Sequence, residues 1–335
     1  MVLADSGPLI FVFNGDADGI ISQTILGKVL GLPDLRITGL KREVHLLRKL
    51  PPLDSGRIHV MDISLRQNLP ELPAVLKPEK IQVTWYDHHE PGEPFVHPRL
   101  ELHINEASGT CSAVIVNQVF GKKHSLWATM AAFGDNLPST AKALAAEAGA
   151  NVDETSVLRH CGILLNYNAY GERPGDVLFA PAYLAQKAAA CNSALDFCHE
   201  EGIFGPLNEQ IEKDSMHFDG IHPLVDSDSA RAFLVPDEPW ARRYAATWAN
   251  SRILSHPKAA LAMIHPRAEG TFMVSIRAPR LSQGAGLSAA DLAMEFSSGG
   301  GRRLAAGINV LPEADFTRFL NRFTSFFKER SKPQC

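Results

Sequence analysis

The sequence has no long hydrophobic run. Nowhere do about 18 apolar residues follow one another, the length at which a helix becomes a candidate membrane span. Residues 1–5 also lack the basic start and the apolar stretch of a secretory signal peptide. We therefore expect a cytoplasmic protein that does not enter a membrane.

Cysteine and net charge are also scarce. The five cysteines are scattered, odd in number and without the spacing of zinc ligands, which favours reduced thiols. The formal net charge of −4 argues against a protein that coats long nucleic acid through bulk electrostatics. A small anionic substrate held by a few local cations is compatible with this charge.

The length of the chain predicts more than one domain. Its 335 residues exceed the size at which a single hydrophobic core usually stops growing, and its 45% hydrophobic residues are ordinary for a globular protein. We place one domain at residues 1–190 and a second at residues 218–335. The less regular residues 191–217 would connect them.

Three short apolar runs have the length of buried strands, at residues 9–13, 57–61 and 80–86. Because they alternate with helical segments as far as residue 135, they predict a parallel sheet with helices on both faces. Ligands of such α/β domains bind just beyond the carboxyl ends of the strands.

An acidic or histidine cluster follows each of these runs, and a fourth comes later. The clusters are NGDADG at residues 14–19, Asp62, DHH at residues 87–89, and Asp135. Carboxylate and imidazole ligands together suit manganese, with magnesium, iron or cobalt as other occupants. Two such ions, about 3.5–4 Å apart, activate a water for in-line displacement at phosphorus.

Each cluster taken alone has a structural explanation as well. Asp and Gly after a strand are ordinary turn residues. The DHH triplet at residues 87–89 is rarer, because an unpaired charge at the end of a buried strand is costly. The four clusters in this order, each in its strand context, favour a metal site.

The order and composition of these clusters resemble the DHH phosphoesterase family, which is named for the triplet at residues 87–89. A second signature, GGGRRLAAG at residues 299–307, resembles the glycine-rich motif of the DHH-associated C-terminal domain. The resemblance, to RecJ-like and nano-RNase-like members, implies a two-domain α/β enzyme. Its parallel-sheet N-terminal domain would hold a manganese pair, and a smaller α/β domain would grip the substrate across a cleft.

The resemblance also assigns metal ligands position by position. Asp62 would bridge the two ions, and Asp16 would hold one of them. Asp18, His88 and Asp135 would complete the other. A water bridging the ions would be the nucleophile, so no serine or cysteine nucleophile is needed.

Two positions depart from the family pattern. Asn14 stands where the family often has histidine or, in the RecJ exonucleases, aspartate, and its neutral amide oxygen is a weaker ligand. Arg302 stands where the C-terminal motif often has histidine, and arginine is a good phosphate fork. His89 would donate to a substrate oxygen or orient a metal ligand.

The second domain supplies the predicted substrate contacts. The backbone N–H groups of Gly299, Gly300 and Gly301 could bind a phosphate, with Arg302 and Arg277 as cationic partners. Around them we expect a strand at residues 230–235, a helix at 240–253 and a hairpin of residues 259–264 with 271–276. A capping box at 288–291 and an aromatic core stripe at 316–327 predict two further helices.

The middle of the chain predicts helices. Residues 139–190 have a helical pattern that we expect to be interrupted at residues 166–171. The sequence SGT at residues 108–110 precedes an apolar helical stretch, as an N-cap or an anion site, and we favour the cap.

These inferences lead to a manganese-dependent phosphodiesterase that cleaves very short oligonucleotides, or dinucleotides such as pGpG, to mononucleotides. A phosphatase of 3′-phosphoadenosine 5′-phosphate or of pyrophosphate-like substrates is the alternative among enzymes. A nucleotide-binding regulator without turnover is the alternative of another class, motivated by Asn14 and Arg302. A homodimer is compatible with all three.

Overall fold

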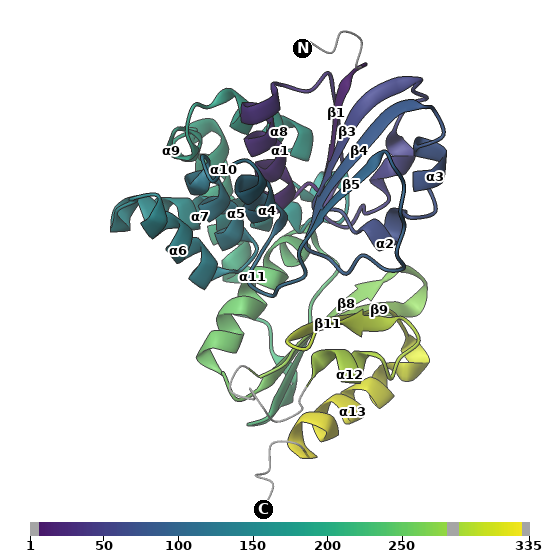
Figure 1. Cartoon of the computed structure of the whole chain (residues 1–335). Helices are drawn as coiled ribbons and strands as arrows, with labels where there is room; N and C mark the ends of the chain where they lie inside the picture. Colours follow the sequence, from purple (N-terminus) through teal and green to yellow (C-terminus); the bar gives the residue numbers. More distant parts are fainter. Residues whose placement is uncertain (1–6, 280–287, 330–335) are drawn as a thin grey trace, which may run out of the picture. The chain divides into compact units, whose positions relative to one another are not determined.

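A computed structural model describes residues 7–279 and 288–329 of the chain (Figure 1). The chain divides into two compact units, Met1–Gln210 (unit 1) and Ile211–Cys335 (unit 2), which we describe separately. None of the helices that the structure describes combines the length and the apolar composition needed to span a bilayer. Cys111, Cys161, Cys191 and Cys198 are free thiols, as predicted, whereas Cys335 lies outside the described residues.

Unit 1 is built on five parallel strands in the order β2-β1-β3-β4-β5. Their bounds are β1 Leu9–Phe13, β2 Leu35–Thr38, β3 Ser55–Met61, β4 Lys80–Asp87 and β5 Leu100–Ile104. The predicted parallel sheet is therefore confirmed. Strands β2 and β3 pair with opposite sides of β1, so the order of the strands changes direction between β1 and β3. In α/β sheets, ligands bind at the carboxyl ends of the strands at such a switch point.

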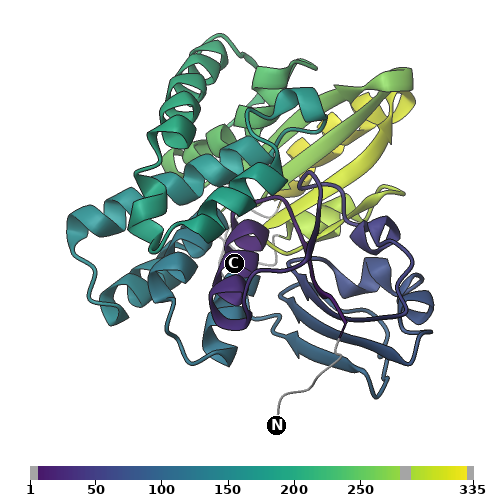
Figure 2. The ribbon, with the colours of Figure 1, turned by 90° about the horizontal axis from the view of Figure 1, so that it is seen from above.

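Helices cover both faces of this sheet (Figures 1 and 2). On one face lie α1 Ala17–Leu30 and α4 Ser112–Val119, which contact β1 and β4. On the other lie η1 Leu46–Lys49, α2 Leu65–Asn68 and α3 Leu72–Val75, packed on the side chains that β1 directs to that face. The remaining elements are α5 Ser125–Gly134, α6 Pro138–Glu147, α7 Val152–Ala169, η2 Pro174–Asp176, α8 Pro181–Ala190 and α9 Ala194–Cys198.

Helix α7 runs through most of the segment where we expected an interruption. The interruption occurs, but it begins only at the end of residues 166–171, because the helix continues to Ala169 and its C-cap is Tyr170. Asn166 and Asn168 are buried, and their side-chain amides bond to the backbone of other segments. These tertiary contacts outweigh the low helix propensity of asparagine.

The predicted irregular connection at residues 191–217 is also wrong, because it is largely helical. It contains α9 and most of α10 Glu201–Phe218, and the boundary between the two units falls inside α10. Pro206 lies in the second turn of α10, where it removes one backbone hydrogen bond without ending the helix.

Unit 2 contains a six-stranded sheet in the order β10-β11-β9-β8-β7-β6, in which only the β7–β8 pair is parallel. The strands are β6 Pro223–Asp226, β7 Ala230–Leu234, β8 Ala260–Arg267, β9 Thr271–Arg277, β10 Gly299–Gly301 and β11 Ala305–Pro312. The predicted strand at residues 230–235 and the predicted hairpin are both confirmed.

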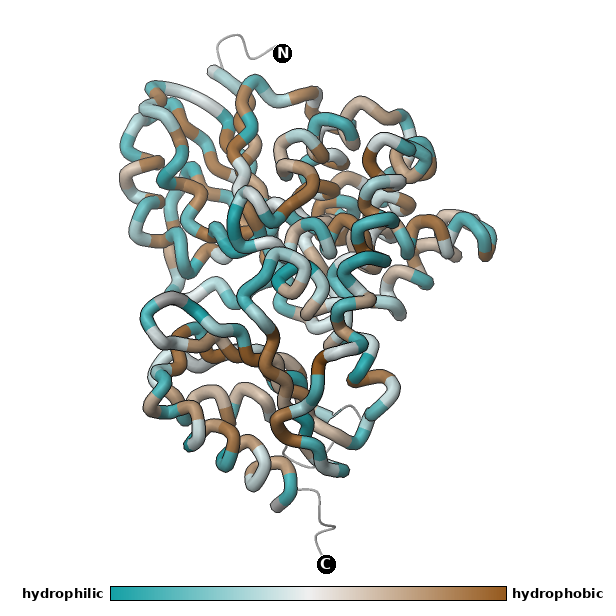
Figure 3. The backbone as a smooth tube through the Cα atoms, turned by 180° about the vertical axis from the view of Figure 1, so that it is seen from behind, coloured by the Kyte–Doolittle hydropathy of each residue, from teal (hydrophilic) through white to brown (hydrophobic). Residues whose placement is uncertain are grey.

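The helices of unit 2 pack on both faces of that sheet. Helix α11 Pro239–Ser255 shares one core cluster with β7 and β8, and α12 Ala289–Ala293 and α13 Phe316–Glu329 share the other. Hydrophobic residues alternate with hydrophilic ones along α13, so its predicted aromatic stripe forms core (Figure 3). The short helices η3 Ala268–Gly270 and η4 Glu313–Asp315 complete the unit.

Candidate metal centre

The loop after β1 brings the first cluster to the crevice between β1 and β3. Asp16 caps α1, and its Oδ1 accepts hydrogen bonds from the backbone N–H groups of Asp18 and Gly19, at 3.0 and 3.1 Å. Gly19 allows this tight turn, because a Cβ there would collide with the carbonyl oxygen of Asn14. The Asp16 carboxylate is thereby held at the end of β1.

Asp18 is buried and caps a second helix. Its Oδ2 accepts from the Ser112 N–H at 2.7 Å and its Oδ1 from the Ala113 N–H at 2.8 Å. Our prediction that residues 108–110 supply the cap of α4 is therefore wrong. The N-cap position is Cys111, and the cap comes from Asp18, which is distant in sequence. Each carboxylate oxygen keeps a second lone pair for a metal ion.

Asp62 follows β3 in a left-handed backbone conformation, with φ of 55°. Such a conformation costs an L-residue on the order of 1 kcal/mol and clusters at functional sites. The Asp62 N–H donates to the carbonyl of Tyr86 at 3.0 Å, which holds the turn in place. The Nε2 atom of His88 lies 3.4 Å from Asp62 Oδ1 and 4.0 Å from Asp18 Oδ2.

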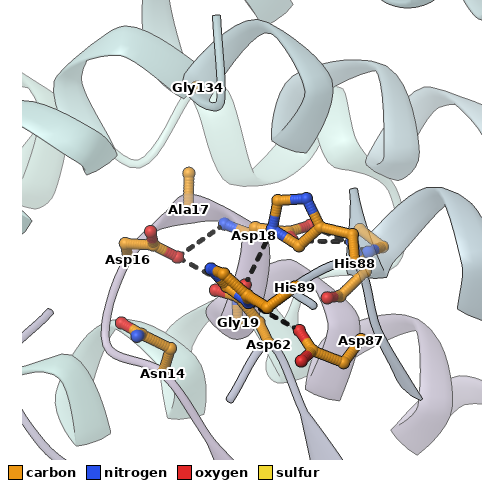
Figure 4. Close-up of polar contacts among 12 residues, drawn as sticks. Asn14, Asp16, Ala17, Asp18, Gly19, Asp62, Asp87, His88, His89 and Gly134 are labelled. Atoms are coloured by element: carbon orange, nitrogen blue, oxygen red, sulfur yellow. Dashed lines mark hydrogen bonds and ion pairs between the residues drawn. The ribbon is translucent and has the colours of Figure 1, made fainter. Parts of the chain in front are cut away.

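The DHH triplet lies at the end of β4, next to Asp62. The side chains of Asp16, Asp62, His88 and His89 converge from three separate segments (Figure 4). Asp87 Oδ1 lies 2.7 Å from His89 Nδ1, whereas its buried Oδ2 has no hydrogen-bond partner among the described residues. One ligand atom from each of four residues lies within 4.8 Å of the others, namely Asp62, Asp87, His88 and His89.

The fourth cluster is attached to the first through α7. Asp135 is the partly buried C-cap of α5. Asn166 Oδ1 accepts from the Ala17 N–H at 2.9 Å, and its amide N–H donates to the carbonyl of Gly134. Ala17 lies between two predicted ligands and Gly134 precedes another, so Asn166 sets their spacing. No sequence motif indicates this role.

Asn14 and Lys41 meet at the edge of the site near β2. The Asn14 side-chain amide donates to the Lys41 carbonyl at 3.2 Å, while its buried Oδ1 has no hydrogen-bond partner among the described residues. The Lys41 ammonium forms an ion pair with Asp16 Oδ2. Lys41 belongs to no motif, and the pairing of β2 with β1 brings it here.

Burial and mutual repulsion dominate the electrostatics of the cluster. Burial, and then the carboxylates of Asp16 and Asp18, raise the pKa of Asp62 well above its ordinary value. Burial and Asp18 also raise the pKa of Asp135 to about 7, against the opposing effect of Lys41. For Asp16, burial acts in the same direction, but Lys41 and hydrogen bonds from Asp62 and Gly19 outweigh it and lower the pKa to about 2.

Comparison of sequences and of structures gives different results. No protein-family model and no curated protein matches the sequence. The structure is similar to a DHH-domain protein described as a member of a family of ribosomal proteins, with a TM-score of 0.70 at 14% identity over 99% of this chain and 88% of that one. The chain has the DHH-domain fold. The resemblance inferred from the sequence motifs is thus confirmed at the level of the fold.

Two other structures with this fold have a more specific description. RecJ from Thermus thermophilus, in complex with Mn²⁺, has a TM-score of 0.65 at 18% identity over 96% of this chain and 52% of that one. This chain therefore spans about half the length of that RecJ. The pGpG-specific phosphodiesterase PggH from Vibrio cholerae has a TM-score of 0.55 at 12% identity over 96% of this chain and 99% of that one.

The residues of this DHH-type site fit divalent cations. Several carboxylates are buried together, which is costly unless cations neutralise them. The buried oxygens Asn14 Oδ1 and Asp87 Oδ2 lack hydrogen-bond partners among the described residues, and His88 Nε2 faces two carboxylates. Oxygen ligands with imidazole suit Mn²⁺, and Mg²⁺ or Co²⁺ are other occupants.

The predicted substrate residues of the DHH-associated motif all lie in unit 2. Gly299, Gly300 and Gly301 form strand β10, which pairs with β11. A Cβ at Gly299 would collide with the carbonyl oxygen of Ala293, so this glycine is required for packing, whereas Gly300 faces open space. Arg302 is exposed, and Arg277 donates to Ser275 Oγ at 2.8 Å. Their role in binding substrate stays a prediction.

Proposed function

We propose that the chain is a metal-dependent phosphodiesterase that hydrolyses very short oligonucleotides, or dinucleotides such as pGpG, to mononucleotides. The observation that carries this proposal is the buried cluster of aspartates and histidines at the carboxyl ends of β1, β3 and β4, within a DHH-domain fold. The proposed cofactor is a pair of Mn²⁺ ions, with Mg²⁺ or Co²⁺ as alternatives.

The proposed ligands are those that the family resemblance implies. Asp62 would bridge the ions, because its carboxyl group contacts Asp16 on one side and His88 on the other. Asp16 and Asn14 would hold one ion, and Asp18, His88 and Asp135 the other. When bound, the two ions would supply an activated water and stabilise negative charge at phosphorus.

His89 has a separate proposed role beside the ions. The buried Asp87 carboxylate holds His89 Nδ1 at 2.7 Å and so fixes the orientation of the ring. In the imidazolium form, with Nδ1–H donating to Asp87, the Nε2–H on the opposite side of the ring would donate to a substrate oxygen. His89 is also 40% exposed at its side chain, which suits contact with a ligand.

Unit 2 would bind the phosphate of the substrate. Arg277 pairs with Ala305 across the β9–β11 ladder, and Arg302 exchanges two backbone hydrogen bonds with the same Ala305. Both arginines therefore lie at one end of the sheet, near the backbone of Gly301, and each has a permanent positive charge. This grouping supports an anion-binding role for Arg277, Arg302 and the β10 glycines.

The proposed short substrate takes its motivation from one of the similar structures. The chain covers 99% of PggH, whose name specifies pGpG, 91% of one RecJ exonuclease and 52% of Thermus thermophilus RecJ. That RecJ was solved with Mn²⁺ and also with Mg²⁺, which supports the proposed choice of ions. We further propose a cytoplasmic location, supported by the free thiols, and a homodimer that sedimentation would test.

A non-catalytic nucleotide-binding regulator is the second candidate. The ion pair between Lys41 and Asp16 and the neutral side chain of Asn14 favour it, because both weaken the attraction of that side of the site for a cation. A regulator would bind dinucleotides with high affinity and release no mononucleotide in the presence of any metal.

A substrate panel tests the proposal. The full chain would be incubated with pGpG, 3′-phosphoadenosine 5′-phosphate and a 20-mer single strand, each with Mn²⁺, with Mg²⁺ or with chelator. We expect Mn²⁺-dependent release of mononucleotides, with pGpG cleaved fastest. Preferential release of phosphate from 3′-phosphoadenosine 5′-phosphate would favour the phosphatase. Binding of pGpG without turnover would favour the regulator.

A further inference from the structure

Lys41 contacts the side of the metal centre that has the weakest ligands. Its ammonium forms an ion pair with Asp16 Oδ2 and lies 5.4 Å from the ring centroid of Tyr170. The side chain is 28% exposed, so the charge is largely withdrawn from water. The neighbouring Asn14 is neutral. A positive charge of the protein therefore already neutralises Asp16.

The loop that carries Lys41 is anchored on both sides of it. Leu40 is buried, and its N–H donates to Glu43 Oε1 at 3.2 Å. Arg42 Nε lies 3.4 Å from Glu172 Oε1. Because both neighbours of Lys41 make contacts, the fold fixes the backbone position from which the Lys41 side chain extends to Asp16.

Gly15 lets this loop approach the metal site. A Cβ at Gly15 would collide with the carbonyl oxygen of Gly39, two residues before Lys41. The backbone of the first cluster and the backbone after β2 are therefore in direct contact. Gly15 therefore permits the close approach of the loop that carries Lys41.

The two sides of the site differ in the charge that they offer a cation. On one side Asp16 is shared with Lys41, and Asn14 adds only a neutral oxygen. On the other, His88 Nε2 lies near both Asp62 and Asp18. A divalent cation beside Asp16 would either displace the ammonium or be repelled by it at short range.

We propose that Lys41 is a built-in competitor for the cation that Asn14 and Asp16 would hold. The chain then binds one divalent cation tightly through Asp18, Asp62, His88 and Asp135. It binds a second one weakly, after the Lys41 ammonium has moved off Asp16. This inference rests on the proposed metal-dependent function and specifies how that function depends on metal concentration.

The test measures metal occupancy without substrate. Metal-free full-length chain is titrated with Mn²⁺ by calorimetry, and the spin coupling between two ions is followed by electron paramagnetic resonance. For the wild type we expect one tight site and a second that is weaker by about tenfold or more. Lys41→Met should tighten the second site by about tenfold and the first, where Lys41 acts on Asp135 alone, by clearly less.

Two variants serve as controls. Lys41→Arg keeps the positive charge and should keep the second site weak. Lys142→Met removes an exposed lysine of α6 and should change neither affinity. Circular dichroism and thermal melting would establish that each variant is folded before the titration is interpreted.

The outcomes that overturn the inference differ from those that overturn the function. Two equally tight sites in the wild type, or an unchanged second site in folded Lys41→Met, would overturn the role of Lys41 alone. Absence of Mn²⁺ binding at both sites would overturn the metal-dependent function as well. Tight binding without hydrolysis of any substrate would leave the inference standing and contradict the proposed enzyme.

Discussion

The proposed metal ligands of unit 1 and the proposed phosphate ligands of unit 2 differ most in their burial. Asp16, Asp18, Asp62 and His88 are each less than a tenth exposed, whereas Arg302 is exposed. A buried carboxylate must be compensated by a partner, so its position reveals what the surroundings provide. An exposed arginine has water as a partner and imposes no such requirement.

This difference decides how far each motif can be interpreted from structure. In unit 1 every carboxylate of the cluster has named neighbours, and two buried oxygens lack hydrogen-bond partners among the described residues. In unit 2, Gly299 is explained by its contact with Ala293, and Gly301 by a φ of 140° and its approach to Ala306. The glycine motif thus has a packing role that is independent of any phosphate.

The largest effect should come from Asp62. Asp62→Asn should reduce Mn²⁺-dependent hydrolysis of pGpG by about a hundredfold or more, because the proposed bridge serves both ions. Asparagine also tolerates the left-handed backbone at this position, so the fold should persist. His88→Ala and Asp135→Ala should behave similarly.

The control for Asp62 is Asp54→Asn, which removes an exposed carboxylate of the same unit. Melting temperature and bound manganese would be measured beside turnover. Near-normal turnover in folded Asp62→Asn would contradict the two-metal site. It would also mean that the burial of the unit 1 carboxylates has no bearing on hydrolysis.

The second prediction concerns pH and the metal-free protein. The pKa of Asp62 is raised well above its ordinary value and that of Asp135 is raised to about 7, so above about pH 4 the folded state holds protons that the unfolded state has released. Stability of the metal-free chain should therefore fall as pH rises from about 4 to 7. Because metal binding needs the ionised carboxylates, the rise in melting temperature with Mn²⁺ should grow over the same range.

Melting curves at pH 5, 6, 7 and 8, with Mn²⁺ and with chelator, would check this. Asp62→Asn is the matched control, since it removes one of the two titrating groups and should flatten the pH dependence of the metal-free protein. A Mn²⁺ effect that is constant from pH 5 to 8 would show that these carboxylates do not bind the ion.

The sequence predicted that the clusters after β1, β3 and β4 meet at one sheet edge, for a physical reason, whereas their role as metal ligands stays a prediction. Apolar runs that end in aspartate or histidine place those residues at one sheet edge as soon as the strands are parallel. Lys41 and Asn166 could not be predicted in this way. Asn166 reaches Ala17 across 149 residues, and its segment has a composition typical of a helix end. Only tertiary contacts bring either residue to the site.

The third prediction concerns Arg302, on the exposed side of the comparison. Arg302→Ala should weaken binding of short phosphorylated substrates by about tenfold, the lower end for a charge-assisted anchor, because the residue is exposed. Dinucleotides should be cleaved faster than 20-mers, since the net charge of −4 attracts no long polyanion.

The measurement is KM and kcat on pGpG and on a 20-mer. Arg318→Ala, another exposed arginine of unit 2 on α13, is the control and should leave both parameters unchanged. Unaltered kinetics of Arg302→Ala on dinucleotides, or equal efficiency on long strands, would remove the glycine and arginine motif from the proposed binding site.

The smallest effect should come from Asn14, the neutral residue within the buried cluster. Asn14→Asp adds a charged ligand where Oδ1 now lacks a hydrogen-bond partner among the described residues, and Asn14→His adds an imidazole. Both should lower the Mn²⁺ concentration for half-maximal activity by a few-fold, about 1 kcal/mol in binding free energy. The gain is limited, because Lys41 continues to neutralise Asp16 and the added carboxylate is itself buried. The double variant Asn14→Asp/Lys41→Met should therefore lower the Mn²⁺ concentration for half-maximal activity by more than the product of the two single effects. The two residues are in contact, so their effects need not add. An unchanged metal titration in both single variants would place Asn14 outside the ligand set.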